Sequence, residues 1–98
     1  MIDPNYFLND IKNYLDVTWD DLGTDTKITS IISAGCAKIA ALTNSSIETI
    51  AKSSEHTELL KEYCRLTWAG VPEKFEEFFG ADMTRLRLRK ISEEYDDE

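Results

Sequence analysis

The chain is short of several residue types that define common classes of protein. Its 98 residues include two cysteines, two prolines, four glycines and one histidine, and 11 basic residues stand against 19 acidic ones. Cys36 and Cys64 form no CxxC motif, and each lies among apolar helical neighbours. The sequence therefore predicts two reduced, buried thiols and no disulfide scaffold. The length suffices for one domain with one modest core.

The single histidine, His56, limits the reactions that the chain can catalyse. A serine or cysteine nucleophile would need it as a base, but it lies in the first turn of an expected helix, where we predict a surface histidine. A zinc site would require His56, Cys36 and Cys64 to converge, and none has finger-like or HExxH spacing. No glycine-rich phosphate loop is present. We expect no enzyme, no catalytic or metal-binding residue and no cofactor.

Long apolar runs and an excess of positive charge are also missing. No stretch approaches the roughly 18 apolar residues that a membrane span needs, and the opening MIDPNYFLND lacks the basic and then apolar pattern of a secretory signal. We therefore expect a cytoplasmic protein without membrane contact. The net charge of −8 disfavours general binding to nucleic acid, because such binding depends on neutralising phosphates.

What the sequence does contain is a succession of helical patterns, which predicts an all-α bundle of about four to five helices. Asp3 and Pro4 open a first helix over about residues 4–15. An acidic turn, DVTWDDLGTD, precedes a second helix over about residues 25–43, capped by Thr24 or Asp25, in which Gly35 allows a close helix crossing. The expected buried stripes are Phe7, Leu8, Ile11, Tyr14 and Leu15 in the first helix, and Ile28, Ile31, Ile32, Gly35, Cys36, Ile39 and Leu42 in the second.

The second half of the chain has weaker boundaries. We predict a flexible loop with one short helical turn around residues 44–54, with a small hairpin as the alternative. Ser54 caps a third helix over about residues 55–69, and Gly70-Val71-Pro72 either breaks or kinks the chain before the next one. Gly80 ends that fourth helix, and a last helix runs from Asp82 to about Glu93. The expected buried positions are Leu59, Leu60, Tyr63, Cys64, Thr67, Trp68, Phe75, Phe78 and Phe79.

The closing stretch TRLRLRKISEEYDDE carries two conflicting patterns. Alternation in RLRLR is typical of a strand, whereas the spacing of Met83, Leu86 and Lys90 fits a helix made mostly of good helix formers. We predict a helix. A single domain over residues 1–92 is then followed by an acidic tail at residues 93–98.

The order of these segments resembles a known family. The opening Met-Ile-Asp, a first helix that ends in IKNYLDV, the acidic turn TWDDLGTDTKI and the helix ITSIISAGCAKIAALTN resemble the short head-tail connector proteins of tailed phages, also called head-completion or adaptor proteins. The later LLKEYCRLTWAGVPEKFEEFFGADMTRLRLRKISEEYDDE resembles the second half of members from Gram-positive phages and prophages. The resemblance covers nearly the whole chain and lies in helix order, length and a few patterned positions.

The resemblance implies an all-α virion structural protein at the head-tail interface, assembled in the host cytoplasm. Such subunits form a homo-oligomeric ring under the portal protein after DNA packaging, extend the DNA channel and dock the next connector or stopper. The resemblance implies no catalytic residue and no cofactor, and leaves open whether the free subunit is a monomer. Acidic subunits around a channel would let DNA pass without sequence-specific binding, because they repel phosphates.

Two stretches are candidates for the contacts with the portal protein or a neighbouring subunit. In the basic run, four side chains would meet acidic surface on the partner, and the acidic turn adds three more candidates. The alternative for the basic run is a solvated helix end in which Arg89 pairs with Glu93 and Lys90 with Glu94. The candidate interface residues are Arg85, Arg87, Arg89, Lys90, Trp19, Asp20 and Asp21.

Two other functions fit the composition. A small acidic regulator that mimics DNA would use the carboxylates of LDVTWDDLGTD to bind a DNA-handling protein. A helical DNA-binding regulator would use RLRLRK as a phosphate contact, although the adjoining acidic residues argue against it.

Overall fold

The predicted all-α class is confirmed by a computed structural model, which describes residues 3–96, with only the backbone described for Pro4 and residues 94–96. A 3-10 helix, η1 (Pro4–Phe7), leads into α1 (Leu8–Tyr14), and four further helices follow: α2 (Leu22–Thr43), α3 (Ile47–Lys52), α4 (Ser54–Trp68) and α5 (Lys74–Asp96). No strand occurs within residues 3–96. RLRLR is therefore helical, as predicted.

The first two helical segments begin at aspartate caps. Asp3 accepts a hydrogen bond from the backbone amide of Asn5 at 2.8 Å, as the Asp-Pro pair predicts. Asp21 caps α2 by accepting from the amide of Thr24 at 2.9 Å. The predicted caps of α2, Thr24 and Asp25, are therefore wrong, and the helix begins earlier, at Leu22.

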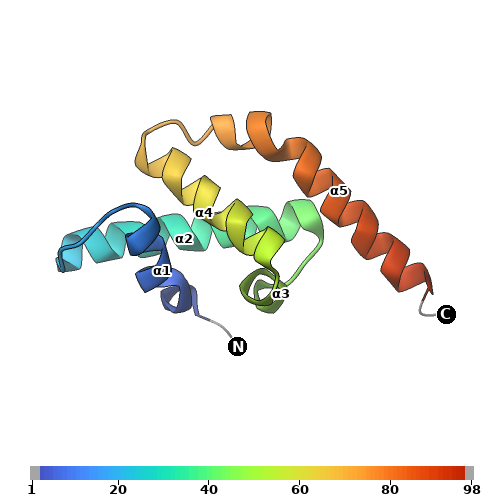
Figure 1. Cartoon of the computed structure of the whole chain (residues 1–98), viewed down its shortest axis with the longest axis horizontal. Coiled ribbons are helices and arrows are strands. Elements are labelled where there is room, and N and C mark those ends of the chain that lie inside the picture. The colour runs from blue at the N-terminus through green and yellow to red at the C-terminus, as the bar shows by residue number, and fades with distance from the viewer. Residues whose placement is uncertain (1–2, 97–98) are drawn as a thin grey trace.

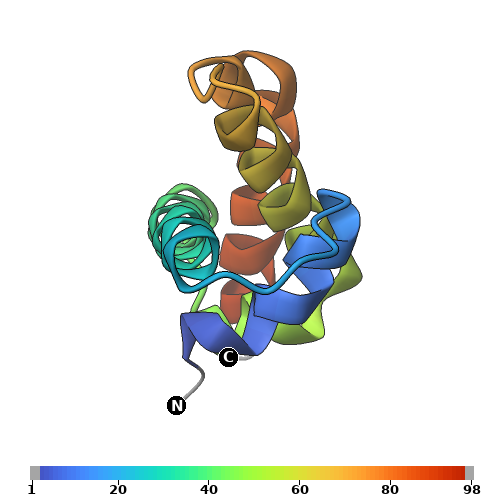
Figure 2. The same ribbon diagram turned by 90° about the vertical axis from the view of Figure 1, so that its left-hand side faces the viewer.

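Helix α2 packs against α4 at Gly35. A Cβ atom at Gly35 would lie 2.6 Å from Cδ1 of Tyr63 and 3.0 Å from Cδ1 of Leu60, which is closer than side chains pack. The predicted close crossing is thus confirmed. Figure 2 looks nearly along α2, which lies beside the column formed by α4 and α5, with α1 at the lower right.

The loop predicted around residues 44–54 is wrong at its centre, which forms α3. Ser46 caps this helix, and its Oγ accepts from the amide of Thr49 at 3.2 Å. Ile50 is fully buried and its carbonyl accepts a 2.7 Å hydrogen bond from Thr57 Oγ1 of α4. A short polar helix is therefore stable here because tertiary packing overrides its weak intrinsic propensity.

The chain splits between α4 and α5 and does not kink. Gly70 has a φ of +86°, a conformation that glycine adopts without strain, and Pro72 lies in the turn before Lys74. The predicted break at Gly80 and restart at Asp82 are wrong, since α5 runs unbroken through both. Phe75, Phe79, Met83 and Leu86 keep helical spacing across Gly80, so one continuous apolar stripe favours one helix.

The core lies where α2, α4 and the first half of α5 meet, closed by η1, α1 and α3. The last turns of α5 lead away from that body, as Figure 1 shows, and the molecule measures 49 × 30 × 17 Å. Sequence patterns missed Val17, Ile50 and Leu66, and the predicted burial of Tyr14 and Phe78 is wrong, since both are exposed. The buried apolar residues are Phe7, Ile11, Val17, Ile28, Ile32, Cys36, Ile39, Ile50, Leu59, Leu60, Cys64, Leu66, Phe75, Met83 and Leu86.

Candidate interaction surfaces

A groove of about 430 Å³ runs between α4 and α5. Its floor is apolar and its rim carries four carboxylates and one guanidinium, so it is an apolar trough with an acidic edge. The α4 side follows helical i, i+3, i+4, i+7 spacing, which places those residues on one face. The groove is lined by Glu55, Glu58, Leu59 and Glu62 of α4 and by Phe79, Asp82, Arg85 and Leu86 of α5.

Glu55 closes one end of this groove by binding two arginines of α5. Arg89 Nη1 lies 2.9 Å from one carboxylate oxygen and Arg85 Nη1 lies 3.3 Å from the other. The hydrogen bond from Arg89, followed by that from Arg85, lowers the pKa of Glu55. Two of the four basic residues predicted as partner contacts therefore bind α4 within the same chain. Arg89 pairs with Glu55 instead of Glu93 among the described side chains.

Glu62, at the far side of the groove, joins α4 to α1. It accepts a hydrogen bond from the Tyr14 hydroxyl and another from Arg65 Nη2, the latter at 2.6 Å. Partial burial alone would raise the pKa of Glu62, but these hydrogen bonds more than offset it and the pKa is lowered. The same bond to Glu62 raises the pKa of Tyr14. Glu62 is thus a structural carboxylate.

The side of α5 that faces away from the groove carries Arg87, whereas Lys90 lies near His56, beside the junction with α3. Successive residues of a helix are separated by about 100°, so Leu88 points nearly opposite to the buried Leu86. Leu88 is 60% exposed and Ile91 40% exposed. Arg87 lies beside them and makes no ion pair with a described side chain. We call Arg87, Leu88 and Ile91 the outer face of α5.

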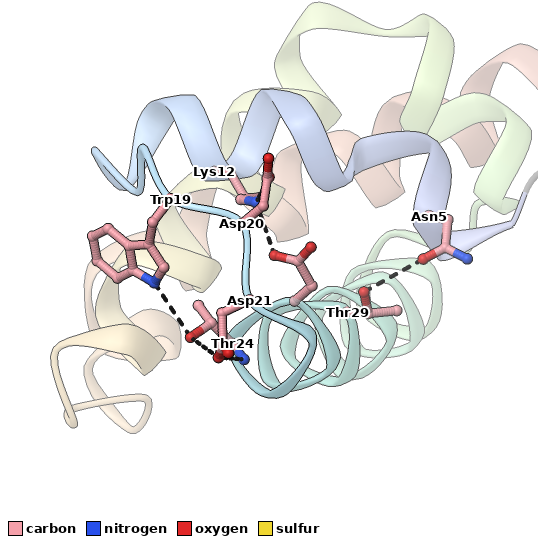
Figure 3. Close-up of polar contacts among 8 residues, drawn as sticks. Asn5, Lys12, Trp19, Asp20, Asp21, Thr24 and Thr29 are labelled. Carbon is pink, nitrogen blue, oxygen red and sulfur yellow. Dashed lines mark hydrogen bonds and ion pairs between the residues drawn. The ribbon is translucent and has the colours of Figure 1, made fainter.

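The acidic turn before α2 is held in place by a buried lysine. Lys12 Nζ lies 3.0 Å from Asp20 Oδ1 and 2.8 Å from Asp25 Oδ1, and Figure 3 shows Lys12 lying against Asp20. The hydrogen bond with Asp25, then that with Asp20, raises the pKa of Lys12 against the opposing effect of burial. Asp20 therefore has an internal partner, although its own side chain is 98% exposed.

The two other candidates in this turn also have internal contacts. Asp21 accepts hydrogen bonds from the backbone amide and from the hydroxyl of Thr24, each at 2.9 Å. The hydrogen bond from the amide is the larger cause of the lowered pKa of Asp21. Trp19 donates from Nε1 to Thr24 Oγ1 at 3.4 Å while 52% of the residue stays exposed. Trp19 thus presents its ring at the surface, as Figure 3 shows. The turn and the basic run belong to separate parts of the molecule.

His56 is buried, so the prediction of a surface histidine is wrong. The residue is 5% exposed, its Nδ1 lies 2.7 Å from Ser53 Oγ and its Nε2 lies 3.3 Å from Ser45 Oγ. Burial, followed by the charge of Arg89, lowers the pKa of His56. The histidine fills the junction of α3, α4 and α5 and ties the cap of α4 to the end of α2.

Both cysteines are free and buried, as predicted. Burial raises the pKa of Cys36 to about 11 and that of Cys64 to about 12, which keeps them as unreactive thiols near neutral pH. Among the side chains that the structure describes, no group of three or more His, Cys, Asp or Glu residues could hold a metal ion. None of the described helices is both long enough and apolar enough to cross a membrane.

Sequence reasoning found the basic run and the acidic turn but missed the α4–α5 groove and the role of Glu55. Glu55, Glu58 and Glu62 form an acidic stripe at helical spacing, and this signal was present in the sequence. The comparison with protein-family models finds no match, and neither a curated protein nor a solved structure matches the chain.

Proposed function

We propose that the chain is a structural subunit of the head-tail connector of a tailed phage or prophage. In this role it forms a ring under the portal protein after DNA packaging, lengthens the DNA channel and presents a surface for the next connector or stopper. The role is mechanical and needs neither a reaction nor a cofactor. It would place the protein at the head-tail interface of the virion, after assembly in the host cytoplasm.

The observation that carries the proposal is the outer face of α5. Leu88 and Ile91 are exposed apolar side chains on a helix that leads away from the body, and Arg87 beside them has no ion-pair partner among the described side chains. An apolar and basic strip on a projecting helix is typical of a surface that becomes buried on assembly. Together with the resemblance in helix order and acidic turn, it supports an assembling subunit.

The net charge supports the same role. A charge of −8 on each subunit gives a ring of such subunits a strongly negative field. DNA would pass through such a ring without adhering, because the ring offers few cationic side chains to replace the counterions of the DNA phosphates. The internal ion pairs of Arg85 and Arg89 with Glu55 further reduce the positive charge available to phosphates.

The test is size-exclusion chromatography with light scattering, over a range of protein and salt concentrations, with and without the portal protein of a related phage. We expect a discrete ring, or capture by the portal assembly. Arg87→Glu should weaken either, whereas Lys52→Glu, an equal change of charge on exposed α3 surface, should not. A monomer that ignores the portal and binds a DNA-handling enzyme instead would contradict the proposal and favour the DNA mimic.

A further inference from the structure

The α4–α5 groove and the outer face of α5 have complementary chemistry. The groove has an apolar floor of Leu59, Phe79 and Leu86 with carboxylates along its rim. The outer face has two exposed apolar side chains, Leu88 and Ile91, beside a cation. Both surfaces are open among the described residues, and each offers what the other lacks.

The charges available for a contact can be narrowed to a few groups. Glu55 forms ion pairs with Arg85 and Arg89. Glu62 accepts a hydrogen bond from Tyr14 and forms an ion pair with Arg65. The two other rim carboxylates are held only loosely by cations of their own helix. Glu58 lies 3.9 Å from Lys61 and is 66% exposed, and Asp82 lies 3.8 Å from Arg85 and is 50% exposed.

On the basic side, Arg87 is the matching group. Arg85 and Arg89 lie on the groove side of α5 and are bound to Glu55. Arg87 is exposed on the other side and makes no ion pair with a described side chain. A guanidinium that meets a carboxylate beside an apolar contact fixes the register of that contact.

We propose that the outer face of α5 in one copy of the chain docks into the α4–α5 groove of a second copy, with Leu88 and Ile91 over Leu59 and Phe79 and with Arg87 against Glu58 and Asp82. This inference rests on the proposed ring-forming role and names the contact that would build the ring.

The positions of the two surfaces fix the kind of assembly that results. Groove and outer face lie on opposite sides of the same helix, so a copy that docks through its outer face still has its own groove open. Such a contact is heterologous, and repeating it gives a closed ring or an open filament instead of a two-fold dimer. The contact should also weaken as salt rises, because it pairs opposite charges at a partly exposed rim.

The test combines charge reversal with cross-linking in the full chain. Arg87→Glu and Glu58→Arg should each weaken self-association at least tenfold, and the two changes in one chain should restore most of it. Lys52→Glu and Glu73→Arg are matched controls at exposed positions away from the groove, and circular dichroism checks the fold of every variant. Leu88→Cys with Glu58→Cys in one chain should form a ladder of disulfide-linked species under oxidation, and each single cysteine variant should not.

The outcomes separate this contact from the proposed function. Rings or portal capture that survive Arg87→Glu unchanged, without a cross-linked ladder, would overturn the contact and leave the connector role standing. A ladder and salt-sensitive self-association without portal capture would support the contact and contradict the connector role. A wild-type chain that stays monomeric with and without the portal, together with a double-cysteine variant that gives no ladder, would overturn both.

Discussion

The contact between α2 and α4 differs in composition from the outer half of α5, by which we mean residues 86–93. At the α2–α4 contact, Gly35 of α2 has no side chain, so α4 packs closely against it, and Leu60 of α4 is fully buried there. In the outer half of α5, Leu88 is 60% exposed and the polar contacts are ion pairs at the surface. The first region contributes buried apolar packing to the stability of the fold, whereas the second leaves apolar and basic side chains exposed.

The largest expected effect separates two leucines. Leu60→Ala should lower the free energy of unfolding by about 2–5 kcal/mol, because it leaves a cavity in the core beside Gly35. Leu88→Ala should change it by no more than about 0.5 kcal/mol, because the side chain is mostly in water. Urea unfolding followed by circular dichroism measures both. Equal losses would mean that the outer half of α5 is part of the cooperative core.

Two glycines in helices make a second pair. Gly35→Ala should lower the free energy of unfolding by about 1–3 kcal/mol, since its Cβ would lie 2.6 Å from Tyr63. Gly80→Ala should raise it by about 0.5–1 kcal/mol, because its Cβ would meet nothing within 4 Å and alanine is the better helix former. Thermal unfolding of both variants beside the wild type gives the sign of each effect. A stabilising Gly35→Ala would refute the close crossing.

A third pair tests the cap of α4, where the core meets α5. Ser53 Oγ accepts from the amide of His56 at 3.4 Å and lies 2.7 Å from its Nδ1. Ser53→Ala should therefore cost about 1 kcal/mol, and Ser54→Ala next to it should cost close to nothing. Chemical unfolding at neutral pH measures the difference. The opposite order would restore Ser54 as the cap, as the sequence alone predicts.

The sequence predicts the α2–α4 contact better than it predicts α5. The stripe of Ile28, Ile32, Cys36 and Ile39 and the close approach at Gly35 were predictable, because burial of one helix face leaves a strict period in the sequence. The continuity of α5 through Gly80 was missed, because glycine there signals an end locally, although the apolar spacing of Phe79, Met83 and Leu86 continues across it.

The candidate surfaces were harder to predict for a physical reason. The sequence shows that residues 84–90 form a basic run. Which of its arginines form ion pairs within the chain depends on the position of Glu55, which is 30 residues from Arg85 in sequence. The sequence likewise predicts His56 at the surface, but in the structure α3 and its flanking serines, Ser45 and Ser53, enclose it. Charge patterns show that a segment is polar, whereas the partner of each charge is decided by tertiary structure.

The smallest expected effect concerns the pH dependence of the outer half of α5. The pKa of Glu55 is lowered by Arg89 and Arg85, so its contribution to folding is present above the unfolded pKa of about 4.3 and is lost as pH falls through the folded value. Amide hydrogen exchange, corrected for intrinsic rates, should show weaker protection of residues 86–93 below that range, with protection in α2 little changed. Glu55→Gln should weaken protection of residues 86–93 already at pH 7 and remove most of its pH dependence there, while Glu48→Gln on α3 serves as the matched control. Protection that keeps its wild-type pH dependence in Glu55→Gln would mean that packing of Leu86, and not the ion pairs, holds α5 against α4.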